Sequence, residues 1–184
     1  MAELTNTAEA ASAAGPTAMV TGAGETRIWG MSSAERLQRT FGRLGLSGPP
    51  DARRGILAAD ARFVFDEALI RALVQHPEVV LVDDDGAPAA VHARGEAALR
   101  LASGEDISAA APSYRRLTAL ELGSAYNSEL RKREPPILTR LSPQNVRAVE
   151  KRTFQGSYKG VTDLVTKYVW PAPARVVTRW CALA

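Results

Sequence analysis

Two short apolar runs in the first third of the chain predict buried strands that each lead into a loop. Residues 17–21 form the first run, which ends at Gly22 and Gly24, as is typical of a strand that enters a turn. Residues 55–59 form the second run, which leads directly to Asp60. The pattern therefore predicts two strands, one followed by glycines and the other by a carboxylate.

Apolar residues at helical spacing lie between and after these runs and predict several helices. Ser32 stands three residues before Glu35, the spacing of a capping box, and Asp66 is placed to cap a helix that His76–Pro77 ends. We expect helices over 33–44, 67–75, 95–102, 116–134 and 143–152, with a loop of small residues over 103–113.

A β-hairpin is the most distinct local pattern. Residues 79–82 and 88–92 are apolar runs joined by Asp83–Gly86, whose Asp-Gly step favours a tight turn. Strands and helices alternate before this hairpin, and helices follow it. The predicted fold class is therefore a layered α/β domain with a mainly parallel sheet and an antiparallel edge.

The chain divides into three segments. We expect residues 1–16 to be a flexible leader rich in small residues, 17–152 to be the α/β domain, and 153–184 to be a basic tail, with a Gly/Ser break at 154–157. A length of 184 residues with 46% hydrophobic residues suits one soluble domain rather than two.

Cysteine and histidine are scarce. Cys181 is the single cysteine, and His76 and His92 are the two histidines. Three such residues cannot form an intrachain disulfide or a structural zinc site of four ligands.

Charge is distributed unevenly along the chain. Residues 1–130 contain 12 arginines and 17 acidic residues, a net −5, whereas residues 131–184 contain 11 basic and 3 acidic residues, a net +8. Such a basic segment favours a phosphate-bearing partner: nucleic acid, a nucleotide or an anionic membrane surface.

The tail has the pattern of two amphipathic helices. Val161, Leu164, Val165, Tyr168 and Val169 share one helical face, and a second face with the same character follows Pro173. Two interpretations are open: both faces pack on their own domain, or they lie on a membrane surface with aromatic and basic residues at the interface. The residues expected to face the membrane are Lys159, Lys167, Tyr168, Trp170, Arg175, Arg179 and Trp180.

The chain has no apolar run long enough to span a bilayer, which takes about 20 residues. Ala184 falls within the second helical pattern of the tail, without a cap or a polar segment after it. We therefore expect that the natural polypeptide continues past this residue.

The loop after the first strand and the residue after the second form a candidate nucleotide site. Gly22, Gly24 and Arg27 fit a turn whose backbone N–H groups approach a phosphate, with the arginine as charge partner. Asp60 would hold Mg²⁺ on that phosphate, since open α/β sheets bind ligands at the carboxyl ends of strands. The alternative is a plain strand-ending turn and an aspartate that makes local backbone bonds.

Three stretches of the sequence carry a further signal. They are Gly24–Gly30 with Ser33–Leu37, Leu130–Pro136, and above all Thr153–Pro171, which has the sequence TFQGSYKGVTDLVTKYVWP. Together they resemble the N-terminal extramembrane part of certain bacterial CDP-alcohol phosphatidyltransferases. In that family a nucleotidyltransferase-like α/β domain precedes juxtamembrane amphipathic helices and a six-helix membrane transferase, and the resemblance covers nearly the whole chain after the leader.

The resemblance implies a place in phospholipid biosynthesis, where the family transfers a phosphoalcohol or phosphatidyl group between CDP and an acceptor hydroxyl. The family's metal-binding aspartates lie in a motif on the membrane helices that this chain lacks, so no catalytic residue is assigned. By position, Gly22, Gly24 and Arg27 match the loop of sugar nucleotidyltransferases, and Asp60 matches their metal-binding aspartate. The lysine of that loop is missing, because the first lysine is Lys132, which favours a degenerate domain.

Three hypotheses follow. The first is an accessory domain on the cytoplasmic face of the inner membrane, with three partners: the anionic membrane surface, its own downstream transmembrane transferase domain, and a second copy in a homodimer formed through that domain. The second is a small stand-alone nucleotidyltransferase that uses Mg²⁺ at Asp60. The third is a nucleic-acid-binding module, which the pattern favours least because the tail aromatics lie on apolar faces.

Overall fold

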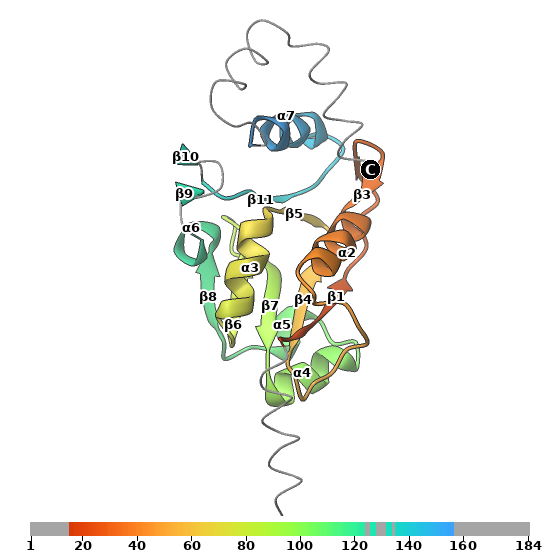
Figure 1. Cartoon of the computed structure of the whole chain (residues 1–184), viewed down its shortest axis with the longest axis vertical. Helices are drawn as coiled ribbons and strands as arrows, with labels where there is room; N and C mark the ends of the chain where they lie inside the picture. Colours follow the sequence, from red (N-terminus) through yellow and green to blue (C-terminus); the bar gives the residue numbers. More distant parts are fainter. Residues whose placement is uncertain (1–14, 124–125, 128–131, 134, 157–184) are drawn as a thin grey trace, which may run out of the picture.

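The computed structural model describes residues 15–123, 126–127, 132–133 and 135–156, which form an α/β domain (Figure 1). Its centre is a five-stranded sheet in the order β1-β4-β7-β6-β8. The strands are β1 (Thr17–Thr21), β4 (Ile56–Asp60), β6 (Val79–Val82), β7 (Pro88–Ala93) and β8 (Arg115–Thr118).

The sheet is mixed. The β1–β4 and β6–β8 pairs are parallel, whereas β7 runs antiparallel to both of its neighbours, β4 and β6. The α/β class and the hairpin are confirmed, but the expected antiparallel edge is wrong, because β7 is the central strand. The tight turn after β6 returns the chain beside that strand, and β4 and β8 then occupy the two remaining free edges of the hairpin.

Helices cover both faces of the sheet. Leu57 and Ala59 of β4 pack toward α2 (Ser33–Arg43) and α3 (Glu67–Gln75). Ile56 and Ala58 of the same strand pack toward α4 (Gly95–Ala102) and α5 (Ile107–Ala110). Because successive side chains of a strand point to opposite faces, one short apolar run supplies both cores.

Local signals fix the starts of the two helices on the first face. Ser32 caps α2, accepting a hydrogen bond from the backbone of Glu35, whose side chain in turn accepts one from the backbone N–H of Ser32. Asp66 caps α3 through the backbone N–H of Ala68. Both predicted caps are confirmed.

A third layer of small elements closes one end of the domain (Figure 1). The hairpin of β2 (Arg27–Ile28) and β3 (Met31–Ser32) lies there, as do the paired strands β5 (Phe63–Phe65) and β11 (Leu138–Arg140). Helix α7 (Val146–Gly156) packs on them through a small core of Ile28, Val64 and Val149.

The helix expected over 116–134 is wrong. This stretch contains the end of β8, the short helix α6 (Ala119–Leu122), and strands β9 (Tyr126–Asn127) and β10 (Lys132–Arg133). Its leucines have roughly helical spacing, but Arg115–Thr118 pair with β6 and Thr118 then forms a capping box with Glu121. Pairing with a distant strand therefore overrides the local pattern.

Three smaller expectations also differ from the structure. The loop over 103–113 contains α5, and β5 was not predicted at all. Helix α7 starts at Val146 instead of 143, because Ser142 and Asn145 exchange hydrogen bonds between backbone N–H groups and side-chain oxygens in a turn. It also continues to Gly156, across the predicted Gly/Ser break.

The two tail helices expected over 153–184 lie, beyond Gly156, outside the described residues. None of the helices in the described part of the chain combines the length and apolar character needed to cross a bilayer.

His92 is a buried histidine in the central strand β7 and is 1% exposed. Its Nδ1 lies 3.0 Å from the carbonyl oxygen of Leu73, and its Nε2 has no hydrogen-bond partner within the described residues. Burial lowers the pKa of His92 below the ordinary 6.5, and the positive charge of Arg94 adds to the effect. The folded chain therefore keeps this ring neutral.

The free energy of unfolding should fall as the pH is lowered from 7 to 5. Below pH 6.5 the unfolded chain takes up a proton at residue 92 that the folded chain, with its lower pKa, does not. This stability is present above the unfolded pKa and is lost on acidification, by at most about 1.4 kcal/mol per pH unit. Urea unfolding of the natural chain and of His92→Gln at several pH values measures this loss. His76 is present in both proteins, so its titration cancels in the comparison. Equal pH dependence in the two proteins would contradict the prediction.

Candidate functional site

The candidate site lies at the carboxyl ends of β1 and β4, the first two strands of the sheet. These strands are parallel neighbours, with Thr21 opposite Asp60 in the register. The loop that starts at Gly22 therefore begins beside the end of β4. The structure brings Gly22, Gly24 and Asp60 to one place, as the sequence predicts.

Both glycines are required by close packing against β4 and the turn after it. A Cβ atom on Gly22 would lie 2.5 Å from Oδ1 of Asp60, and the φ of +66° at this residue disfavours any other side chain. A Cβ atom on Gly24 would lie 2.3 Å from the carbonyl oxygen of Ala61. The loop thus lies directly against the carboxylate and the next turn, where only glycine fits.

Asp60 is buried, with 3% of its surface exposed, and is bound by Arg62. The Nε atom of Arg62 lies 3.0 Å from Oδ1 and 2.8 Å from Oδ2 of the carboxylate, and Nη2 donates to Oδ2 as well. The backbone N–H of Arg62 also donates to Oδ1, at 2.8 Å. Both oxygens of this carboxylate are therefore occupied by a residue only two positions along the chain.

Hydrogen bonding to Asp60, reinforced by the negative charge of that carboxylate, raises the pKa of Arg62. A forked guanidinium on a carboxylate is among the stronger pairings in proteins. The Arg62 side chain is 44% exposed, so solvent screens part of this attraction. The pair still neutralises the one carboxylate that the sequence singles out.

The donor set around Asp60 does not fit a magnesium ion in this geometry. Mg²⁺ takes oxygen ligands, and to bind Asp60 it would have to displace the guanidinium of Arg62. Within the residues that the structure describes, no cluster of three or more His, Cys, Asp or Glu side chains could hold a metal ion.

A pocket of about 250 Å³ lies beside the Asp60–Arg62 pair. The loop 23–26 lines one side of it, and Ala61, Arg62, Arg140 and Leu141 line the other. Strand β11 brings Arg140 here, and the backbone N–H of Leu141 donates to the carbonyl oxygen of Arg62 at 2.8 Å. The charged side chains that line this cavity are Glu25, Arg62 and Arg140, and Arg62 is already paired with Asp60.

Arg27, the fourth predicted residue, is not part of this pocket. It lies on β2, and its Nη1 donates to the carbonyl oxygen of Gly30 across the β2–β3 hairpin at 3.0 Å. The predicted membrane-facing residues, from Lys159 to Trp180, lie outside the described part of the chain.

Sequence reasoning missed Arg62 and Arg140. The spacing of Arg62 two residues after Asp60 was a usable signal, because a strand-ending aspartate often pairs within its own turn. No local signal points to Arg140, since its position depends on the pairing of β11 with β5, more than 70 residues away in sequence.

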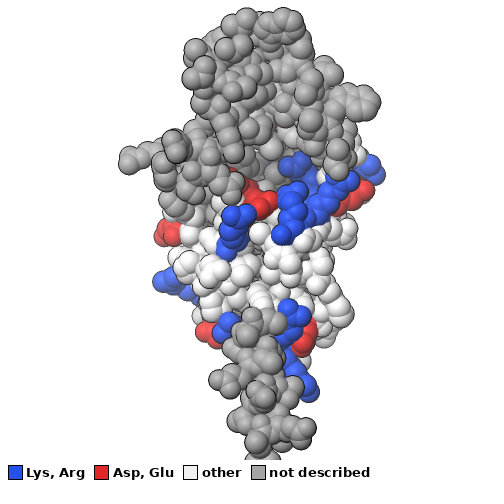
Figure 2. All heavy atoms as spheres, in the orientation of Figure 1, with Lys and Arg blue, Asp and Glu red and all other residues white. Residues whose placement is uncertain are grey.

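Basic side chains also gather outside this pocket. In the space-filling view, Lys and Arg residues form a band over the region of α2, next to the grey residues at the α7 end of the domain (Figure 2).

No protein-family model matches the chain, and neither the curated proteins nor the solved structures give a match.

Because Asp60 has a structural role, its replacement should lower the stability of the folded domain. Asp60→Asn removes the charge of a buried carboxylate that accepts several hydrogen bonds from Arg62, so the free energy of unfolding should fall by about 1–3 kcal/mol. A double-mutant cycle with Arg62→Gln, measured by urea unfolding, should give a coupling energy above about 0.5 kcal/mol. Unchanged or increased stability in Asp60→Asn, as expected for an aspartate kept for catalysis, would contradict this interpretation.

Proposed function

We propose that this chain is a non-catalytic accessory domain of a membrane-bound CDP-alcohol phosphatidyltransferase. The observation that carries its non-catalytic part is the Asp60–Arg62 pair, and the resemblance of Thr153–Pro171 carries the choice of family. In a nucleotidyltransferase-like domain, the strand-end carboxylate would hold the metal of the nucleotide. Here both of its oxygens bind Arg62, so the position serves structure instead of chemistry.

A nucleotidyltransferase-like origin of the fold is part of this proposal. Its support is a layered α/β domain whose first strand runs into a glycine loop and whose neighbouring strand ends at an aspartate. The loop lacks a lysine, because the first lysine of the chain is Lys132. These features fit a domain that has kept the frame of a nucleotide-binding fold without its reactive groups.

The tail supports a position at the cytoplasmic face of the inner membrane. Residues 131–184 carry a net +8, and the apolar face that the sequence predicts from Val161 to Val169 is bordered by Lys159 and Lys167. Basic residues beside an apolar face and interfacial aromatics are the composition of a segment that lies on anionic lipid. The segment Thr153–Pro171 also carries the strongest part of the family resemblance.

The proposed partners follow from this position. They are the anionic lipid surface and the transferase domain downstream in the same polypeptide, through which two copies would form a homodimer. A stand-alone nucleotidyltransferase with Mg²⁺ is the alternative that the glycine loop favours, and the bound state of Asp60 weighs against it. A nucleic-acid-binding module has less support, because the first 130 residues carry a net −5.

The full chain should co-sediment with vesicles of anionic phospholipid through its tail. Replacing Lys159, Lys167, Arg175 and Arg179 with Gln should weaken binding tenfold or more, because each basic residue near the surface contributes about 1 kcal/mol. The matched control replaces Arg53, Arg100, Arg115 and Arg116, four exposed or partly exposed arginines of the domain, with Gln. Equal vesicle binding by the two variants would contradict the proposed membrane position.

A further inference from the structure

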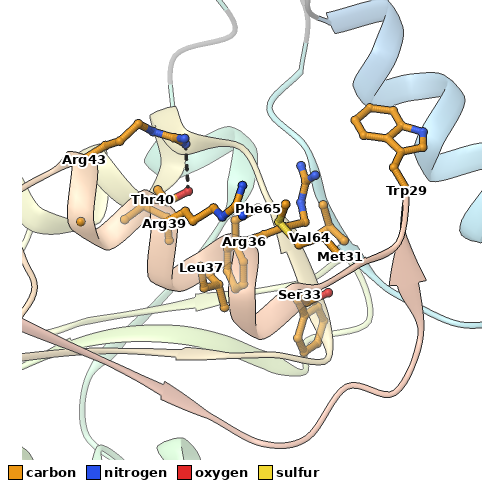
Figure 3. Close-up of a pocket in the computed structure, with 13 residues that line it drawn as sticks. Trp29, Met31, Ser33, Arg36, Leu37, Arg39, Thr40, Arg43, Val64 and Phe65 are labelled. Carbon is orange, nitrogen blue, oxygen red and sulfur yellow. Dashed lines mark hydrogen bonds between the residues drawn. The ribbon is translucent and has the colours of Figure 1, made fainter. Parts of the chain in front are cut away.

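A second cavity, independent of Asp60, lies between α2 and the β5 strand (Figure 3). Its volume is about 560 Å³, within the range of pockets that hold small ligands. Its apolar lining comes from α2, α3 and the strands β3 and β5: Met31, Leu37, Phe63, Val64, Phe65 and Ile70. A hydrocarbon group would therefore find a hydrophobic floor here.

Three arginines of α2 line the same cavity, and no acidic residue does. Arg36, Arg39 and Arg43 are three and four positions apart, so they project from one side of the helix (Figure 3). Arg43 is neutralised by Glu67, at 2.9 Å, which lies outside the lining. The pocket thus combines an apolar floor with a cationic rim.

Of the three arginines, Arg36 is the one whose positive charge a bound anion would stabilise most. Its guanidinium carbon lies 5.8 Å from the centre of the Trp29 ring, a cation–π contact, and it forms no ion pair with a carboxylate among the residues described. Burial lowers the pKa of Arg36, and the positive charge of Arg43 adds to this shift. A half-buried cation of this kind is stabilised by a bound anion.

Ser33 supplies an additional polar group to the lining. The residue is 2% exposed, and its hydroxyl has no hydrogen-bond partner within the described structure. Buried hydroxyl groups normally have a hydrogen-bond partner, so this one is available to pair with an oxygen atom of a bound ligand.

The pocket lies at the end of the domain from which the tail departs. The backbone N–H of Trp29 donates to Oε1 of Glu150 on α7, at 2.9 Å. This bond joins one wall of the cavity to the last described helix, and the basic tail begins where that helix ends. If the tail lies on a membrane, the pocket is near the lipid headgroups.

We infer that this cavity binds one anionic phospholipid, with the phosphate at Arg36 and Arg39 and the first acyl carbons over Phe65. Arginine matches phosphate geometrically, since its planar fork offers paired donors to two oxygens. The apolar floor distinguishes a lipid phosphate from a free phosphate or a nucleotide, whose bodies are polar. The inference rests on the proposed membrane position but concerns a different part of the chain.

Calorimetric titration of the full chain with dihexanoyl phosphatidic acid, kept below its micelle concentration, tests the inference. We expect saturable binding that weakens at least tenfold in Arg36→Gln. Arg100→Gln is the charge-matched control, because Arg100 lies on α4 and pairs with Glu96, and it should bind as the natural chain does. Arg39→Gln, at an exposed position, gives the same test if Arg36→Gln does not fold.

Three comparison ligands separate the sources of the phosphate. Inorganic phosphate and CMP should bind at least tenfold more weakly than the lipid, because neither covers the apolar floor. Dihexanoyl phosphatidylcholine should also bind more weakly, because choline cancels the charge. Binding of CMP or phosphate as tight as that of the lipid would overturn the inference, as would unchanged lipid binding in both arginine variants.

Failure of this inference and failure of the proposed function give different results. Arg36→Gln leaves the four basic residues of the tail in place, so its vesicle binding should fall less than that of the tail variant. The tail variant leaves the pocket unchanged, so its titration with the soluble lipid should match that of the natural chain. A protein that binds the soluble lipid but not vesicles would retain the pocket and lose the membrane position.

Discussion

The close contact between the loop after β1 and the buried carboxylate at the end of β4 determines the structure of this edge of the sheet. A Cβ atom at Gly22 would lie 2.5 Å from Oδ1 of Asp60, so only glycine fits there, and Asp60 is held in turn by Arg62. The carbonyl oxygen of Arg62 then accepts the hydrogen bond from Leu141 that places β11. One carboxylate therefore connects two strands of the central sheet to the third layer of the domain.

The Asp60–Arg62 pair shows how an α/β fold can be present while the carboxylate at its strand end is occupied. Enzymes of the α/β class place reactive carboxylates where strands end, because loops there can surround a ligand. Here the same position is filled from within the chain, by a neighbouring guanidinium and by a close glycine loop. Arg36, which forms no ion pair with a carboxylate among the described residues, lies away from this strand end, on α2.

The sequence was sufficient to predict those helices, strands and turns that form through interactions between residues close together in the chain. Residues 17–21 and 55–59, the Ser32 and Asp66 caps, and the Asp-Gly turn each act within a few positions, and the corresponding elements are present in the structure. It was insufficient wherever pairing is distant. The helix expected over 116–134 fails because β8 adds to β6, and the place of β7 at the centre depends on which strands join the hairpin.

The candidate site divides in the same way. Gly22, Gly24 and Asp60 were identified because each follows a recognisable strand, and parallel pairing brings strand ends together. Arg62, which occupies the carboxylate of Asp60, was missed although it lies only two residues away. Nothing in the sequence pattern shows that its side chain turns back onto the strand. Arg140 and the α2 pocket depend on contacts of β5 with β11 and α2 that no local pattern encodes.

The central claim is that this domain acts as the extramembrane part of a larger membrane protein. The most direct measurement is the intact mass and cell fraction of the native polypeptide, detected in cell extracts with an antibody to residues 15–123. The account predicts a species well above the 19.7 kDa of this chain in the membrane fraction. A 19.7 kDa species in the soluble fraction would contradict it and would return attention to the glycine loop and Asp60.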